Sequence, residues 1–215
     1  VLVRSGEVGL GQSVVTSVDE QWRLGACQAH SGTHVVHAAL RQVLGPSALQ
    51  SGSYNKSGYM RLDFSWNDAL SAETRSEIED IANNAVSANY DVITKEMSVD
   101  EAKAAGAMAL FGEKYGDNVR MIQFGTSKEL CGGTHVKNTS EIGLFKIVSE
   151  SSAAAGIRRI EAISGDKSAE YFKNLEKQIT ALSQLLKSKD VVRSIEKLIE
   201  ENTALKSKKK QKVKS

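Results

Sequence analysis

An α+β fold with a mainly antiparallel sheet, packed helices and a helical appendage is predicted by three features of the sequence. Segments with the two-residue alternation of strands are interleaved with segments of helical period. The turn expected at residues 55–58 is too short for a parallel crossover, so the strands on either side of it should pair antiparallel. After residue 165 the strand patterns stop, and apolar residues recur at spacings of three and four.

The composition is that of a globular protein. Of the 215 residues, 40% are hydrophobic and 25% are charged, which disfavours disorder. No apolar stretch approaches the roughly 18 residues of a membrane span and no export signal is recognised, so we expect no membrane partner, a cytoplasmic location and reduced cysteines. Because the chain opens on Val1 rather than methionine, we expect it to be a piece of a longer protein.

Charge is distributed unevenly along the chain. The formal net charge is +2, yet residues 206–215 carry six lysines and no acid, so the remainder is slightly acidic. Contact with nucleic acid is therefore expected at local patches or at this tail rather than over the whole surface. A solvated helix end is the alternative interpretation of the tail.

The first part of the chain is expected to contain strands on both sides of a helix. Residues 7–27 place turn signals between apolar positions and are interpreted as two or three short strands. A helix is predicted over residues 29–44, where Gly45 and Pro46 stop it. A hairpin follows, and its second strand, residues 59–65, alternates apolar and polar side chains as a half-buried strand does.

The remainder of the chain is expected to add one long helix, four strands and a helical appendage. The predicted elements are a helix at 71–89, a strand at 92–97, a short helix opened by a capping box of Ser98 and Glu101, and strands at 119–124, 142–150 and 157–163. Residues 166–215 are predicted to form a helical hairpin or the start of a coiled coil, with a break at 188–190. Its apolar seam could pair within the chain or between chains and consists of Phe172, Leu175, Ile179, Leu182 and Leu186.

The four histidines of the chain fall in only two places. His30 and His34 are four residues apart on the predicted helix, so both rings project from one face and can reach a single ion. Cys131 and His135 form a second pair in the segment CGGTH, whose glycines allow the backbone to fold tightly round a ligand. His37 lies on nearly the same helix face and is expected to be packed or to support a ligand.

These side chains predict a zinc site. Imidazole and thiolate are ligands that zinc prefers, and two pairs from distant parts of a chain can hold the ion tetrahedrally. A zinc protease would need glutamate at the second position of HExxH to activate water. Ser31 and Gly32 occupy that gap, so peptidase activity is disfavoured.

Four segments of the chain resemble a known family. HSGTHVVHAALRQVLG, SGSYNKSGYMRLDFSW, LCGGTHV and GLFKIVSESSAAAGIRRIEAISG look like the editing domain of alanyl-tRNA synthetases and their free-standing relatives, and are similar to the editing region of threonyl-tRNA synthetases. The likeness runs from about residue 20 to 165. It implies that residues 1–27 are the remnant of a small β-barrel, 28–165 a zinc-binding editing core and 166–215 the helical appendage. It does not include an aminoacylation domain, so ATP-dependent aminoacylation is expected only of a longer protein.

The resemblance also implies roles for single residues. It assigns zinc binding to His30, His34, Cys131 and His135. Thr33 matches the threonine that contacts the hydroxyl of a mischarged serine. Gln50 matches a glutamine associated with editing. Together with Cys131, Gln50 is expected to serve catalysis, and Gly132 and Gly133 are expected to shape the substrate site.

The implied function is hydrolytic editing of tRNA(Ala) mischarged with serine or glycine. Serine differs from alanine by one hydroxyl and glycine by one methyl group, differences that a single binding pocket rejects poorly. Two alternatives remain, namely a non-catalytic tRNA-binding module clamped by zinc and a free-standing deacylase. A zinc ion with four protein ligands is typical of structural sites, so zinc could either act in the reaction or only position the substrate.

Each assigned role has a simpler structural alternative. The Thr33 hydroxyl could bond back to its own helix, and Gln50 could bond a neighbouring strand. Arg61 and Asp63 share one strand face and are expected to form an ion pair that supports the site. Of the two arginines in the last strand, Arg158 and Arg159, one could meet phosphate, although structural salt bridges are an equal expectation.

Overall fold

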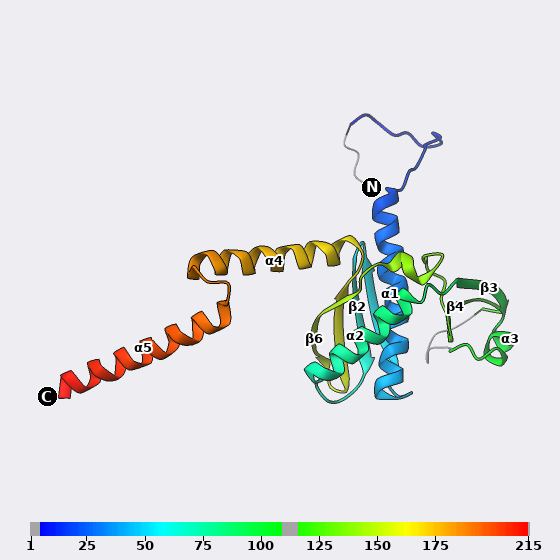
Figure 1. Ribbon diagram of the computed structural model, residues 1–215. Helices are drawn as coiled ribbons and strands as arrows, with labels where there is room; N and C mark the ends of the chain where they lie inside the picture. Colours follow the sequence, from blue (N-terminus) through cyan, green and yellow to red (C-terminus); the bar gives the residue numbers. More distant parts are fainter. Residues whose placement is uncertain (1–4, 109–115, 215) are drawn as a thin grey trace. The chain divides into compact units, whose positions relative to one another are not determined.

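The computed structural model describes residues 5–108 and 116–214 (Figure 1). By its internal contacts the chain divides into two compact units, Val1–Gly165 and Asp166–Ser215. Among the described residues, the first unit contains two antiparallel sheets and four helical segments, and the second contains two helices. The α+β class with antiparallel strands is therefore confirmed.

The long helix α1 (Glu20–Leu44) is the centre of the first unit. Asp19 caps its start, because the carboxylate accepts a hydrogen bond of 2.7 Å from the Trp22 main-chain N–H. The helix ends at Gly45, whose φ of 99° is favourable only for glycine. From Gly25 to Leu40 nearly every residue of α1 is at least half-buried, so this helix is covered on several sides.

The strands predicted over residues 7–27 are wrong. No strand or helix forms in the described residues 5–19, and residues 20–27 belong to α1. The apolar side chains between Val8 and Val18 are exposed, so this segment has no sheet to join. A strand needs a hydrogen-bonded neighbour, whereas the capped helix satisfies its own backbone.

Four strands form the larger sheet, in the order β1-β2-β7-β6. They are β1 (Gln50–Lys56), β2 (Tyr59–Ser65), β6 (Lys146–Ala154) and β7 (Ile157–Ile163), and each pairs antiparallel with its neighbour. Helices α1 and α2 (Ala72–Ser87) pack with this sheet, and the hairpin turn predicted at residues 55–58 is confirmed. Large side chains of the shared core include Phe64, Phe145, Leu40, Met60, Leu62, Ile78 and Ile160.

The smaller sheet has the order β3-β4-β5 and lies beside α1. Its strands are β3 (Val92–Ser98), β4 (Asn118–Phe124) and β5 (Ser127–Leu130), with the short helix α3 (Val99–Ala104) between β3 and β4. The predicted capping box is confirmed, because Ser98 and Glu101 exchange side-chain and backbone hydrogen bonds. Strand β5 was not predicted, since four residues reading SKEL carry no apolar alternation.

One predicted strand is displaced along the chain. Residues 142–150 were expected to form it, but the short helix η1 (Thr139–Ile142) occupies the start of that range and β6 begins only at Lys146. Gly143 ends η1 with a φ of 69°, a left-handed conformation that breaks extended backbone. Ile142 is fully buried, so its apolar character reflects the core rather than a strand.

Asp63 has a stronger partner than the predicted one. Its carboxylate lies 3.9 Å from Arg61 Nε but accepts two hydrogen bonds, of 2.7 and 2.8 Å, from Arg159 on β7. Arg158 donates to Glu150 on β6 at 2.6 Å. Both arginines of β7 therefore form structural ion pairs.

Asp63→Asn is expected to lower the free energy of unfolding by about 1–2 kcal/mol, because one bidentate, half-buried charge pair is lost. Hydrogen bonding by Arg159 lowers the pKa of Asp63 below its usual 3.8. The loss should therefore be complete above pH 3.8 and shrink as the pH falls through the lowered pKa of the folded protein. Urea unfolding of both proteins between pH 3 and 7 measures this difference, and a constant difference over that range would contradict the pairing.

The second unit consists of α4 (Asp166–Leu186) and α5 (Val191–Lys214), separated by the predicted break. The apolar side chains of the predicted seam are mostly exposed, as are the apolar residues of α5 up to Leu205. Self-association through these helices stays a prediction. Side chains from residue 208 onward, which include most of the lysine-rich tail, lie outside the described part of the chain. None of the described helices has the length and apolar character of a membrane-spanning helix.

Candidate metal centre

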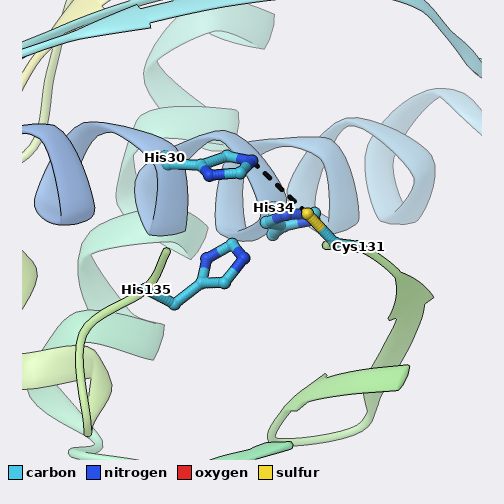
Figure 2. A group of neighbouring side chains, drawn as sticks. All are labelled: His30, His34, Cys131 and His135. Carbon is cyan, nitrogen blue, oxygen red and sulfur yellow. Dashed lines mark hydrogen bonds between the residues drawn. The ribbon is translucent and has the colours of Figure 1, made fainter. Parts of the chain in front are cut away.

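Four side chains from two distant segments converge on one point (Figure 2). His30 and His34 project from α1, and Cys131 and His135 come from the segment that follows β5. The possible ligand atoms of these four residues all lie within 4.8 Å of one another. Cys131 Sγ is 3.5 Å from His30 Nε2, and the rings of His30 and His135 are 4.3 Å apart between centroids. The structure thus brings together the two pairs that the sequence identifies.

The environment of Cys131 favours the thiolate. Burial raises the pKa of this thiol, but the nearby imidazoles of His135, His30 and His34 outweigh burial and lower the pKa to about 3. The thiolate is the form that binds metal ions. Cys131 is therefore prepared to act as a ligand at neutral pH.

A buried carboxylate, Glu129, lies on the opposite side of His34 from the cluster. Its Oε2 accepts a hydrogen bond of 2.6 Å from His34 Nδ1, and its Oε1 lies 3.3 Å from His37 Nδ1. Burial lowers the pKa of His34, but the proximity of Cys131 and the hydrogen bond with Glu129 raise it to about 9. A proton on His34 thus offsets two neighbouring anions, Glu129 and Cys131. A divalent cation in the cluster would neutralise both.

The loop between Cys131 and His135 is shaped to approach α1 closely. A Cβ atom on Gly133 would overlap the His30 ring, whereas a Cβ on Gly132 would meet no atom within 4 Å. The Gly133 carbonyl accepts a hydrogen bond from the Arg120 guanidinium on β4. The Ser31 hydroxyl accepts a hydrogen bond of 3.1 Å from the Val136 main-chain N–H, which fixes the far end of the loop to α1.

Zinc fits the residues that are present. Three imidazoles and one thiolate form a donor set typical of zinc. Neither His34 Nε2 nor His135 Nε2 has a hydrogen-bond partner among the described residues, although both atoms are buried. Buried nitrogen atoms are rarely left unsatisfied, so a ligand at this point would remove a cost of about 1–3 kcal/mol for each.

A cavity of about 390 Å³ opens beside the cluster. Its wall includes His30, His34 and Cys131 together with Thr33 and Gln50. Further lining residues are Ser53, Gly116, Asn118, Val119, Arg120, Glu129, Leu130 and Gly132. The residues that the resemblance assigns to catalysis and to serine recognition therefore face one space, and three of the four candidate metal ligands lie at its edge.

Two of these residues are held by specific contacts. The main-chain N–H of Gln50 donates to His37 Nε2 at 3.2 Å, which fixes the start of β1 against α1. Thr33 Oγ1 lies 3.0 Å from the Ala29 carbonyl oxygen and 2.8 Å from Asn55 Oδ1. The bond to its own helix, considered above as the alternative for Thr33, is therefore present. Since one hydroxyl has one proton, the remaining lone pair of Thr33 can still accept a bond from a ligand.

Sequence reasoning missed Glu129, Asn55 and Ser31. Glu129 is one of 26 acidic residues and lies in an unpredicted strand, so nothing local distinguishes it. A metal-bound histidine usually donates its second N–H to a carboxylate or carbonyl, which predicts that such a partner exists without saying where. Asn55 could have been inferred from the strand alternation, because it lies on the same face of β1 as Ser53, which lines the cavity.

Part of the candidate metal centre lies within a segment that matches a known protein family. Residues 119–161 match the family described as the threonyl and alanyl tRNA synthetase second additional domain. That range contains Glu129, Cys131 and His135, whereas His30 and His34 precede it.

Several alanine–tRNA ligases are similar to most of the chain. The one from Leifsonia xyli subsp. xyli is 60% identical over 190 residues, which cover 87% of this chain and 21% of that protein. The one from Clavibacter michiganensis subsp. michiganensis is 60% identical over 187 residues, covering 86% and 21%. The one from Mycolicibacterium gilvum is 48% identical over 204 residues, covering 93% and 23%. The chain thus spans about a fifth of the length of the curated relatives it matches.

Proposed function

We propose, from its homology to an editing-region segment of alanyl-tRNA synthetases, that this chain hydrolyses the ester linking serine or glycine to tRNA(Ala). The observation that carries the proposal is the shared cavity, where the zinc-type cluster meets Gln50 and Thr33. Hydrolysis of such an ester needs a polarised carbonyl, a positioned water molecule and a means of selecting the wrong amino acid. Each requirement has a candidate side chain at this cavity.

His30, His34, Cys131 and His135 would hold the zinc ion. When bound, zinc would act as a Lewis acid that could polarise the ester carbonyl or orient the substrate amine. Because four protein ligands make a closed site, orientation of substrate is the role most consistent with this donor set.

Gln50 is proposed to orient the attacking water or the ester carbonyl. Its side-chain amide is neutral at all working pH values, so it can donate and accept hydrogen bonds but cannot act as a base. The bond from its main chain to buried His37 holds the start of β1 in place. A fixed amide beside the ester reduces the cost of positioning water.

Thr33 is proposed to recognise the hydroxyl of serine. Its oxygen can accept a hydrogen bond from the substrate while its own proton is donated to Ala29 or Asn55. Alanine would leave that acceptor unpaired, at a cost of about 1–3 kcal/mol. The cavity would then favour the amino acid that the synthetic site rejects poorly.

Thr33→Val should lower seryl-tRNA(Ala) deacylation by about 10-fold, because the hydroxyl acceptor is replaced by a methyl group of similar shape. Glycyl-tRNA(Ala) deacylation should fall much less, since glycine has no hydroxyl to bond. The measurement compares kcat/KM for the two substrates with the same protein preparation. Equal losses for both substrates would refute recognition through Thr33.

The direct test of the function compares deacylation of seryl-, glycyl- and alanyl-tRNA(Ala) side by side, with zinc and with a chelator. We expect hydrolysis of the first two esters, little hydrolysis of the third, and loss of activity in chelator. The closed donor set also suits a tRNA-binding module in which zinc only stabilises the fold. Tight tRNA binding by the zinc-loaded protein with background hydrolysis of all three esters would favour that module.

A further inference from the structure

A chain of hydrogen bonds connects the candidate metal centre to Gln50. Glu129 is only 5% exposed. One of its oxygens accepts a hydrogen bond of 2.6 Å from His34 Nδ1, and the other lies 3.3 Å from His37 Nδ1. His37 is completely buried, and its Nε2 accepts the main-chain N–H of Gln50 at 3.2 Å. The first three members come from α1 and β5, and the last begins β1, so three elements meet in this chain.

The proton positions along this chain are fixed by one group that can only donate. A main-chain N–H is always a donor, so His37 must present a bare Nε2 to Gln50 and carry its proton on Nδ1. That Nδ1–H then needs an acceptor, which Glu129 Oε1 provides. The other oxygen of Glu129 holds the proton of His34 on Nδ1 and leaves Nε2 free to face the cluster. One carboxylate therefore sets the tautomers of both histidines.

We infer that Glu129 and His37 are positioning residues. Through their hydrogen bonds they fix the metal-binding nitrogen of His34 and the main chain of Gln50 in place relative to each other at the cavity. This inference rests on the proposed function for the role of Gln50. Neither residue needs to touch the substrate. Glu129 acts on the metal through His34, and His37 acts on the reaction through Gln50.

The variant Glu129→Gln separates the two contacts by chemistry. A carboxylate offers two acceptors, whereas an amide of the same shape offers one acceptor and one donor group. Because the Gln50 N–H keeps the proton of His37 on Nδ1, the single amide oxygen faces His37. The amide N–H group then faces His34 Nδ1 and favours a proton on His34 Nε2, the nitrogen that faces the cluster. Zinc affinity should therefore fall by about 10- to 100-fold, the range typical of lost support for a metal ligand.

Two substitutions of His37 divide its roles. An asparagine amide can reach the position of Nδ1, so His37→Asn keeps a donor for Glu129 and loses the acceptor for Gln50. A glutamine amide can reach the position of Nε2, so His37→Gln keeps the acceptor for Gln50 and loses the donor. We expect His37→Asn to lower kcat for seryl-tRNA(Ala) about 10- to 100-fold with little change in KM, and His37→Gln to retain most of kcat.

The experiment measures zinc affinity by competition with a chelator, kcat and KM for deacylation, and melting temperature. The matched control is Glu77→Gln on the exposed side of α2, which should leave all four quantities unchanged. Parent-like zinc affinity in a folded Glu129→Gln protein, or equal kcat for the two His37 variants, would overturn the inference.

A spectroscopic measurement keeps the inference testable if the variants fold poorly or the parent has no deacylase activity. Long-range ¹H–¹⁵N correlation spectra of the zinc-loaded parent report which ring nitrogen of each histidine carries the proton. We expect the proton on Nδ1 in both His34 and His37. A proton on Nε2 of either ring would contradict the assignment, whereas absence of hydrolysis with the expected tautomers would count against the proposed function alone.

Discussion

Replacing Cys131 by alanine is expected to remove bound zinc and to lower seryl-tRNA(Ala) deacylation by about 100-fold or more. Loss of a side chain that binds the metal directly should lower activity by more than the 10- to 100-fold that is typical when a residue supporting a ligand is lost. The substitution also removes the thiolate that lies among the three candidate histidine ligands. Zinc content by mass spectrometry of the intact protein and single-turnover deacylation measure the two effects.

The control for Cys131→Ala is Cys27→Ala, because it makes the same substitution at the other cysteine of the chain. Cys27 is buried in the main core and belongs to no candidate ligand set among the described residues. Its replacement should lower the melting temperature without removing zinc. Deacylation by Cys131→Ala within a factor of two of the parent would contradict the placement of this thiol at the metal.

Gly133→Ala is expected to weaken zinc binding by about 10- to 100-fold. The added Cβ would overlap the His30 ring, so the ring must turn away or the loop must move. Either adjustment separates His30 from Cys131. In the parent protein, His30 Nε2 lies 3.5 Å from Cys131 Sγ. Chelator competition measures the affinity, and circular dichroism checks that the fold is retained.

The adjacent Gly132→Ala is the matched control for zinc affinity. A Cβ at Gly132 meets no atom within 4 Å, so this variant should bind zinc like the parent. It adds a methyl group to the wall of the cavity and is therefore informative about substrate binding only. Equal zinc affinities for both alanine variants would contradict the close packing of this loop against α1.

The candidate metal ligands could be predicted from sequence because their signal is local. The spacing of His30 and His34 on one helix face, and the dense CGGTH segment, depend on no distant residue. The supporting residues could not be predicted in this way. Glu129 acquires its role from burial beneath α1, and that burial depends on the pairing of β5 with β4.

The same distinction between local and distant determinants explains which elements of the fold could be predicted from the sequence. The capping box at Ser98 and the stop at Gly45 are decided within one helical turn, and both were predicted. Alternating apolar residues between 7 and 27 resembled strands, but a strand depends on a partner that the described segment lacks. The Asp19 cap was the overlooked local signal, and it starts α1 nine residues before the predicted helix.

X-ray absorption at the zinc edge, combined with metal content, tests most directly whether the four side chains share one ion. The expected result is one zinc per chain, bound by three nitrogen ligands and one sulfur ligand at about 2.0–2.3 Å. Protein that is folded in zinc-containing buffer yet holds no zinc would contradict the site, as would zinc bound without sulfur.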